Sequence, residues 1–124
     1  MKVLLIEDDK RIVRFLKIGL EAERYYLDVA SDGQMGIEMA TSTPYDAIII
    51  DLMLPIKGGR EVYRHLRENG VRSPILVLTA VGTSEIKSLA LKEGVDDFMT
   101  KPFSFEVLLT RLQALVGGRQ PEHP

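Results

Sequence analysis

Apolar residues along the chain form two kinds of segment, which alternate from one end to the other. Short, largely apolar runs occur at five places, and between them apolar residues recur every three or four positions. Runs of this length are typical of strands covered on both faces, as in a parallel sheet. The predicted strands are Val3–Ile6, Leu27–Ala30, Ala47–Ile50, Ile75–Leu78 and, more weakly, Phe98–Met99.

The stretches between the runs have the pattern of amphipathic helices. The stretch after the first run and the last stretch both place their apolar residues on one face. Another helix is predicted to begin at a cap formed by Thr83 or Ser84 and to reach about Glu93. Strands and helices in this alternation predict an α/β fold, with a parallel sheet and helices on both of its faces.

Composition narrows the class of protein. The chain has 124 residues, of which 45% are hydrophobic and 27% charged, as in a single globular domain. The absence of cysteine excludes disulfides, thiolate metal sites and cysteine nucleophiles. A net charge of −2 indicates no nucleic-acid surface, and no apolar run approaches the roughly 20 residues that span a membrane. The opening MKVLLIEDD is too acidic for a signal peptide, so we expect a cytoplasmic protein.

Polar residues follow four of the predicted strands directly. They are Glu7-Asp8-Asp9 after the first strand, Asp51 after the third, Thr79 after the fourth and Lys101-Pro102 just past the fifth. Ligands of an open parallel sheet bind beyond the carboxyl ends of its strands, so these side chains should meet at one edge. Two carboxylates about 4 Å apart repel by roughly 4 kcal/mol at an effective dielectric constant of about 20. The acids therefore predict a bound cation, and oxygen ligands favour Mg²⁺.

A magnesium ion beside a lysine and a hydroxyl suits the transfer of a phosphoryl group. Asp51 is the candidate nucleophile, because aspartate carboxylates form acyl phosphates. Lys101 would pair with one phosphoryl oxygen, and Thr79 would donate a hydrogen bond to another. Taken singly, each residue also has an ordinary explanation as a helix cap, a turn residue or a solvated charge. Their joint occurrence at successive strand ends favours the site.

The motifs VLLIEDD, DLMLP, LTA and GVDDFMTKPF, in this order, resemble those of the response-regulator receiver family of two-component signalling. The resemblance covers Lys2 to about Val116, and Met53 with GVDDFMTKPFS is most similar to the OmpR/PhoB type. It implies a flavodoxin-like (βα)5 fold over residues 1–116, doubly wound, with parallel strands in the order 2-1-3-4-5. Members of this type usually carry a winged-helix DNA-binding domain after a linker. Residues 117–124, which lack apolar periodicity, are therefore interpreted as a linker or C-terminal tail.

The resemblance also implies a role for each residue of the acidic cluster. Asp51 would accept a phosphoryl group from a sensor histidine kinase or from a small phosphodonor. Asp8 would bind Mg²⁺ directly and Glu7 through water, and Asp51 and the backbone carbonyl of Met53 would be further ligands. Asp9 is expected to cap the following helix rather than to bind the metal.

On this resemblance the domain is a signalling switch and not an enzyme. It would promote only its own phosphorylation and slow dephosphorylation, and it would control an effector, commonly in transcription. The domain itself would bind neither nucleic acid nor membrane. The Lys101–Pro102 peptide bond is expected to be cis.

Phosphorylation would act on a switch and on a dimer face. Thr79 would move towards the phosphoryl oxygens, and Phe98 would turn inward behind it. The surface of the fourth helix, fifth strand and fifth helix would then favour a symmetric homodimer. On this face the charged residues that match the family are Lys87, Asp97 and Arg111.

Several positions depart from the family pattern. Phe98 replaces the more common tyrosine and has no hydroxyl to donate, and Val107 stands where an acid usually faces Lys87. The residues two positions beyond the acceptor aspartate and the switch threonine are Met53 and Val81. Neither can orient an attacking water, so slow spontaneous loss of phosphate is predicted.

Three other functions fit parts of the pattern. A Mg²⁺-dependent aspartyl phosphatase would place a second aspartate two residues after the nucleophile, where this chain has Met53. A flavin-binding domain would need a hydroxyl- and glycine-rich phosphate loop after the first strand, where Glu7 and Asp8 would repel a phosphate. A pseudo-receiver, which binds partners without phosphorylation, is disfavoured because the chain has all five residues of the phosphorylation site: Glu7, Asp8, Asp51, Thr79 and Lys101.

Overall fold

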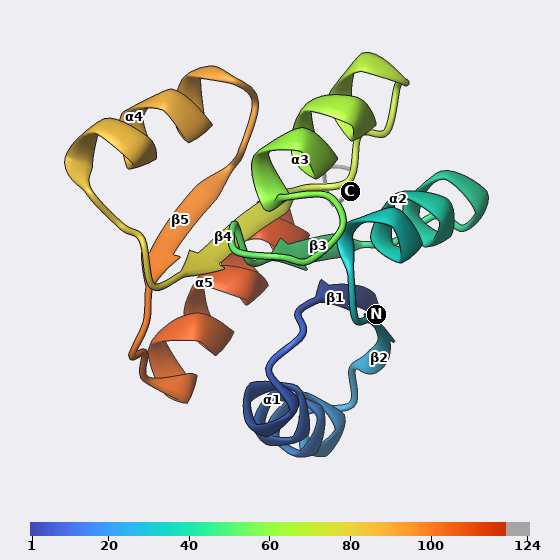
Figure 1. Cartoon of the computed structure of the whole chain (residues 1–124). Helices are drawn as coiled ribbons and strands as arrows, with labels where there is room; N and C mark the ends of the chain where they lie inside the picture. The colour runs from blue at the N-terminus through green and yellow to red at the C-terminus, as the bar shows by residue number, and fades with distance from the viewer. Residues whose placement is uncertain (119–124) are drawn as a thin grey trace.

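Strands and helices alternate along the whole of the described chain (Figure 1). The computed structural model describes residues 1–118. The elements are β1 Lys2–Ile6, α1 Lys10–Ala22, β2 Tyr26–Ala30, α2 Gly33–Ser42, β3 Ala47–Ile50, α3 Gly59–Glu68, β4 Ile75–Thr79, α4 Ser84–Lys92, β5 Asp97–Thr100 and α5 Phe105–Gly118. Each predicted strand is confirmed, with at most one residue added at either end.

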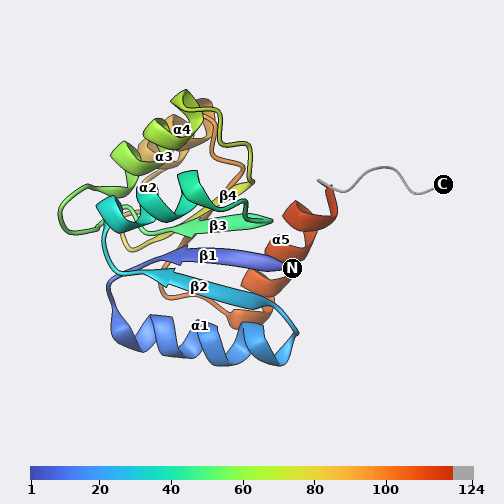
Figure 2. The same ribbon diagram turned by 90° about the vertical axis from the view of Figure 1, so that its right-hand side faces the viewer.

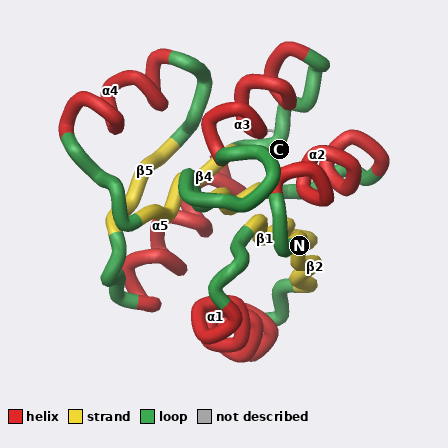
Figure 3. The backbone as a smooth tube through the Cα atoms, viewed as in Figure 1, coloured by secondary structure: helices red, strands yellow, loops and turns green. Residues whose placement is uncertain are grey.

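The strands form one parallel sheet in the order β2-β1-β3-β4-β5, which confirms the predicted fold and strand order. Helices α1 and α5 cover one face of the sheet, and α2, α3 and α4 cover the other (Figures 1 and 3). Leu4 and Ile6 point into the core beneath α2 and α3, whereas Val3 and Leu5 point into the core beneath α1 and α5. Both faces of the inner strands β1, β3 and β4 are buried, and this explains their continuous apolar runs.

Helix starts follow the capping residues of the sequence. The Asp9 carboxylate accepts a hydrogen bond from the Arg11 N–H at 2.9 Å, which confirms Asp9 as the cap of α1. Of the two predicted caps of α4, Thr83 is the one used, and its hydroxyl accepts from the Ile86 N–H at 3.2 Å. These caps set the direction in which α1 and α4 leave the carboxyl-end edge of the sheet.

Helix α5 is longer than its apolar stripe indicates. It continues to Gly118, two residues beyond Val116, so the first two residues of the predicted tail are helical. A glycine costs a helix only about 1 kcal/mol relative to alanine, which a packed helix of 14 residues can tolerate. The rest of the predicted tail, residues 119–124, lies outside the described residues.

The loop between β3 and α3 is held in place by backbone hydrogen bonds at its ends and at its middle. The Gly59 N–H donates to the Leu52 carbonyl at 2.9 Å, and the Gly33 N–H at the start of α2 donates to the Pro55 carbonyl at 3.3 Å. Within this loop Ile56 has φ +71°, in the left-handed region. A non-glycine residue in that region costs roughly 1–2 kcal/mol, and branching at Cβ makes it still less favourable.

The site residues and the N-terminus lie at opposite edges of the sheet. All strands run in the same direction, so their carboxyl ends, with the residues that follow them, share one edge. The N-terminus and the end of α5 lie at the opposite edge, beside the amino ends of the strands (Figure 2). Within residues 1–118, no helix combines the length and the hydropathy needed to cross a membrane.

Candidate functional site

Three carboxylates meet at the carboxyl-end edge of the sheet. Strands β1 and β3 pair with Ile6 opposite Ile50, so Glu7 and Asp51, which follow them, leave the sheet side by side. Oxygens of Glu7, Asp8 and Asp51 all lie within 4.8 Å of one another. The Glu7 and Asp51 residues are only 1% and 5% exposed, whereas Asp8 faces solvent. The predicted acidic cluster therefore exists in the folded chain.

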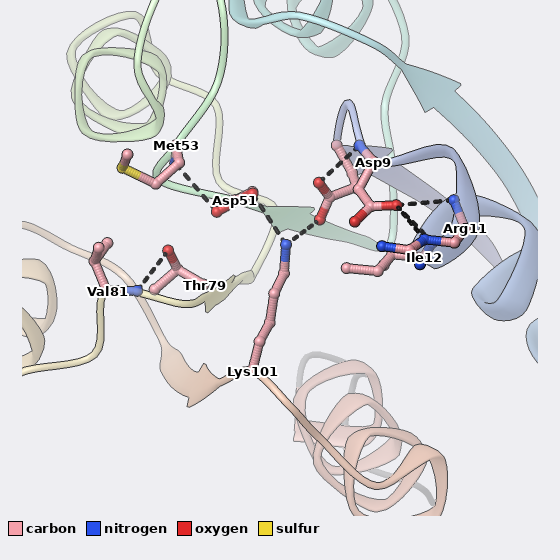
Figure 4. Close-up of polar contacts among 9 residues, drawn as sticks. Asp9, Arg11, Ile12, Asp51, Met53, Thr79, Val81 and Lys101 are labelled. Atoms are coloured by element: carbon pink, nitrogen blue, oxygen red, sulfur yellow. Dashed lines mark hydrogen bonds and ion pairs between the residues drawn. The ribbon is translucent and has the colours of Figure 1, made fainter.

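Lys101 joins two of these acids (Figure 4). Its Nζ atom lies 2.9 Å from Glu7 Oε1 and 3.1 Å from Asp51 Oδ2. The Lys101–Pro102 bond is cis, as expected, at the point where the chain leaves β5. The residues that make these ion pairs are 94 and 50 positions apart in sequence, so only the fold brings them together.

Burial and hydrogen bonding have opposing effects on the pKa values of Glu7 and Lys101. Burial raises the pKa of the Glu7 carboxyl, and the hydrogen bond from Lys101 opposes but does not cancel this effect. Burial lowers the pKa of the Lys101 ammonium, but its hydrogen bonds to Glu7 and Asp51 outweigh burial and leave this pKa above its ordinary value. A charged lysine thus faces two buried carboxylates, with a third carboxylate at the rim.

The geometry of the three acids fits a hard divalent cation. Oxygens bound to one Mg²⁺ lie about 2.0–2.1 Å from it, so any two of them are at most about 4.2 Å apart. The Glu7, Asp8 and Asp51 oxygens lie within 4.8 Å of one another, so at most small rotations of the carboxylates would bring them within this limit. The exposure of Asp8 leaves room for the waters that Mg²⁺ retains.

Backbone N–H groups orient two of the carboxylates, a contribution that the sequence interpretation missed. The Met53 N–H donates to Asp51 Oδ1 at 3.1 Å, and the Asp9 N–H donates to Glu7 Oε2 at 3.1 Å (Figure 4). An acid often accepts from the N–H two residues ahead of it, so the spacing from Asp51 to Met53 was the available signal. Asp51 is thereby held by Lys101 on one oxygen and by the backbone on the other.

Thr79 lies near this cluster at the end of β4 (Figure 4), and Phe98 lies in β5, opposite Val77 of β4. Thr79 is buried, and its Oγ1 accepts from the Val81 N–H at 3.3 Å, so its own hydroxyl hydrogen is available to a ligand. The Phe98 ring is buried in the same core cluster as Ala90, with Ile86 packed against that cluster. A phenylalanine ring has no hydroxyl to hydrogen-bond with water, so burial in the core is its favoured position. The movement of either residue on phosphorylation stays a prediction.

The residues of the expected dimer face lie together on α4, β5 and α5. Arg111 Nη1 is 3.3 Å from Asp97 Oδ1 and also donates to the Phe98 carbonyl at 3.2 Å. Lys87 and Val107 are both exposed and border the same surface hollow as Arg111. The charged residues that resemble the family pattern are thus brought onto one surface, with Val107 among them.

Comparisons with known proteins agree with this geometry. The sequence model of the response regulator receiver domain matches residues 3–113. Response regulator ArlR of Staphylococcus saprophyticus is 41% identical over 98% of the chain and 54% of its own length. Transcriptional regulatory protein QseB of Haemophilus influenzae is 42% identical over 99% of the chain and 56% of its own length. The chain therefore spans about half the length of these relatives.

A solved structure is similar over almost the whole chain. The receiver domain of sensor histidine kinase PA1611 from Pseudomonas aeruginosa PAO1 superposes with a TM-score of 0.84 and 32% sequence identity. The match covers 94% of this chain and 97% of that one. That structure is described as having a magnesium ion coordinated in its active-site cleft.

Proposed function

This chain belongs to the response regulator receiver domain family, of the OmpR/PhoB type, and we propose that Asp51 is its phosphoryl acceptor. Receiver domains act in two-component signalling, where they receive a phosphoryl group from a histidine kinase. The observation that supports Asp51 most strongly is its placement: a nearly buried carboxylate held by Lys101 on one oxygen and by the Met53 N–H on the other.

The proposed reaction follows from the positions of the side chains. An Asp51 oxygen attacks phosphorus in line, so that a P–O bond forms while the P–N bond to the donor histidine breaks. Lys101 then pairs with a phosphoryl oxygen as well as with Glu7, and the Thr79 hydroxyl donates to another. Glu7, Asp8 and Asp51, with the carbonyl of Met53, would hold Mg²⁺. When bound, the ion neutralises the oxygens of the transferring group.

The output of the switch is also a proposal, because the chain spans about half of its curated relatives. We propose that the phosphorylated domain controls transcription in the cytoplasm through a DNA-binding part of the whole protein, a role that the name of QseB suggests for that relative. The domain would signal as a homodimer through the face of α4, β5 and α5. Apolar Met53 and Val81 near Asp51 would make loss of the phosphate slow.

The proposal is tested by intact-mass spectrometry after incubation with acetyl phosphate and Mg²⁺. The unmodified chain should gain the mass of one phosphoryl group, and Asp51→Asn should gain none. EDTA should abolish the gain in the unmodified chain. No gain in the unmodified chain would instead indicate a pseudo-receiver, and an equal gain in both chains would place the acceptor elsewhere.

A further inference from the structure

The loop between β3 and α3 exposes apolar side chains beside the acceptor. Met53 is 61% exposed and Ile56 is 76% exposed, and Pro55 between them also faces solvent. The intervening Leu52 and Leu54 pack against the core instead. We call Met53, Pro55 and Ile56 the rim patch. It begins two residues from Asp51 in sequence, and the Met53 N–H contacts the Asp51 carboxylate directly.

Ile56 is placed unfavourably for the isolated domain. Its φ of +71° lies in a region that glycine adopts readily and that β-branched residues avoid. Burial of the side chain could compensate for this, but most of the Ile56 surface remains in solvent. Neither backbone geometry nor packing within residues 1–118 therefore favours isoleucine here, and its apolar surface is open to contact with another molecule.

The rim patch is also fixed in position. The hydrogen bond from Gly59 to Leu52 joins the two ends of the loop, and the bond from Gly33 to Pro55 holds its middle. A Cβ atom on Gly33 would lie 2.0 Å from the Lys57 carbonyl oxygen, so α2 and the loop are in direct backbone contact. A surface fixed in this way loses little conformational entropy when a partner binds.

We infer that the rim patch is a docking site for the protein that delivers the phosphoryl group, with Ile56 as its apolar anchor. This inference rests on the proposed function. Transfer needs the donor phosphorus within about 3–3.5 Å of the carboxylate, so a protein donor must lie over the residues that border Asp51. Met53 is one of these residues, and Ile56 follows three residues later in the same loop with 76% of its surface exposed. The partner should present an apolar pocket that accepts the isoleucine.

Two donors distinguish docking from chemistry at Asp51. The protein donor is an autophosphorylated histidine kinase, selected beforehand for transfer to the unmodified chain, and the small donor is acetyl phosphate. Ile56→Gly and Ile56→Asn both tolerate the left-handed conformation and remove the apolar side chain. We expect each to slow transfer from the kinase about tenfold, a change of 1.4 kcal/mol. Labelling by acetyl phosphate should stay within twofold of the unmodified rate.

A matched control separates the side chain from the backbone. Arg24, exposed just after α1, has φ +68°, so Arg24→Gly relieves a similar conformation far from Asp51 in sequence. Both glycine variants should raise Tm by a few degrees, but only Ile56→Gly should slow the kinase reaction. This comparison shows whether a slower reaction comes from the lost side chain rather than from the glycine itself.

Other outcomes overturn the inference. Unchanged kinase transfer to both Ile56 variants would show that the patch does not dock the donor. An equal loss with both donors would assign Ile56 to the geometry of the loop. Faster loss of phosphate with unchanged transfer would assign it to exclusion of water. Failure of the proposed function is distinct, because then acetyl phosphate would label none of the chains.

Discussion

At the scale of the residue, Glu7 carries a charge that its surroundings disfavour. Burial raises the pKa of this carboxyl above its ordinary value of 4.5. In the pH range just above 4.5, the folded chain therefore keeps the proton on Glu7, whereas the unfolded chain has released it. Stability from this group therefore falls as pH rises through that range. We expect the neutral isostere Glu7→Gln to raise Tm by a few degrees at neutral pH without divalent cations, as measured by circular dichroism.

Magnesium should reduce the Tm advantage of Glu7→Gln over the unmodified chain. The unmodified chain has one more carboxylate for the ion, so MgCl₂ should raise its Tm more than that of Glu7→Gln. Glu68→Gln, an exposed site at the end of α3, is the matched control and should behave like the unmodified chain. A lower Tm for Glu7→Gln without Mg²⁺ would contradict the prediction.

At the scale of the element, α3 and α4 are joined through one carboxylate. Glu93, at the end of α4, accepts from Arg60 Nη2 at 2.7 Å and from the Tyr63 hydroxyl at 2.7 Å. The hydrogen bond from Arg60 is the main cause that lowers the pKa of Glu93 to about 2. The stability that Glu93 provides should therefore be complete above its ordinary pKa of 4.5 and lost as pH falls towards about 2.

Glu93→Gln tests this joint between the helices. The variant should have a lower Tm than the unmodified chain at pH 6, and the difference should shrink steadily below about pH 4.5. Thermal unfolding at a series of pH values measures both. A difference that is the same at pH 6 and pH 3 would show that the Glu93 charge does not contribute.

The close approach of α3 to the end of β3 depends on Gly59. A Cβ atom there would lie 2.3 Å from the Asp51 carbonyl oxygen, so Gly59→Ala must move the backbone of the acceptor. We expect a loss of roughly 1–3 kcal/mol in unfolding free energy and slower labelling by acetyl phosphate. Gly117→Ala, with nothing within 4 Å of the added atom, should instead stabilise α5 by up to about 1 kcal/mol. Urea unfolding compares the two variants.

Strands and the acidic cluster could be predicted from sequence because both depend on side-chain type. Runs such as Ala47–Ile50 are apolar throughout, and residues after parallel strands must share an edge. Backbone geometry could not be predicted in the same way. The left-handed Ile56 breaks the usual preference for glycine, and nothing in the residue types shows that the Phe98 ring packs into the core.

At the scale of the whole molecule, the expected dimer face lacks one member of the charge pattern that the resemblance implies. Lys87 is exposed beside Val107, where the resemblance would place an acid to pair with the lysine of a second copy. We expect the chain with beryllium fluoride and Mg²⁺ to dimerise weakly, and Val107→Glu to raise the dimer fraction in sedimentation velocity. Val107→Gln, which adds no charge, is the control. An equal dimer fraction for Val107→Glu and Val107→Gln would contradict the charge argument.

The placement of the chain ends has a consequence for protein engineering. The N-terminus and the end of α5 lie at the edge of the sheet opposite Asp51 (Figure 2). A fluorescent protein or an enzyme fused at either end would therefore stand clear of the acceptor and of the rim patch. The domain is thus suited to serve as the input module of a designed sensor, in which cargo at its ends does not block the signal.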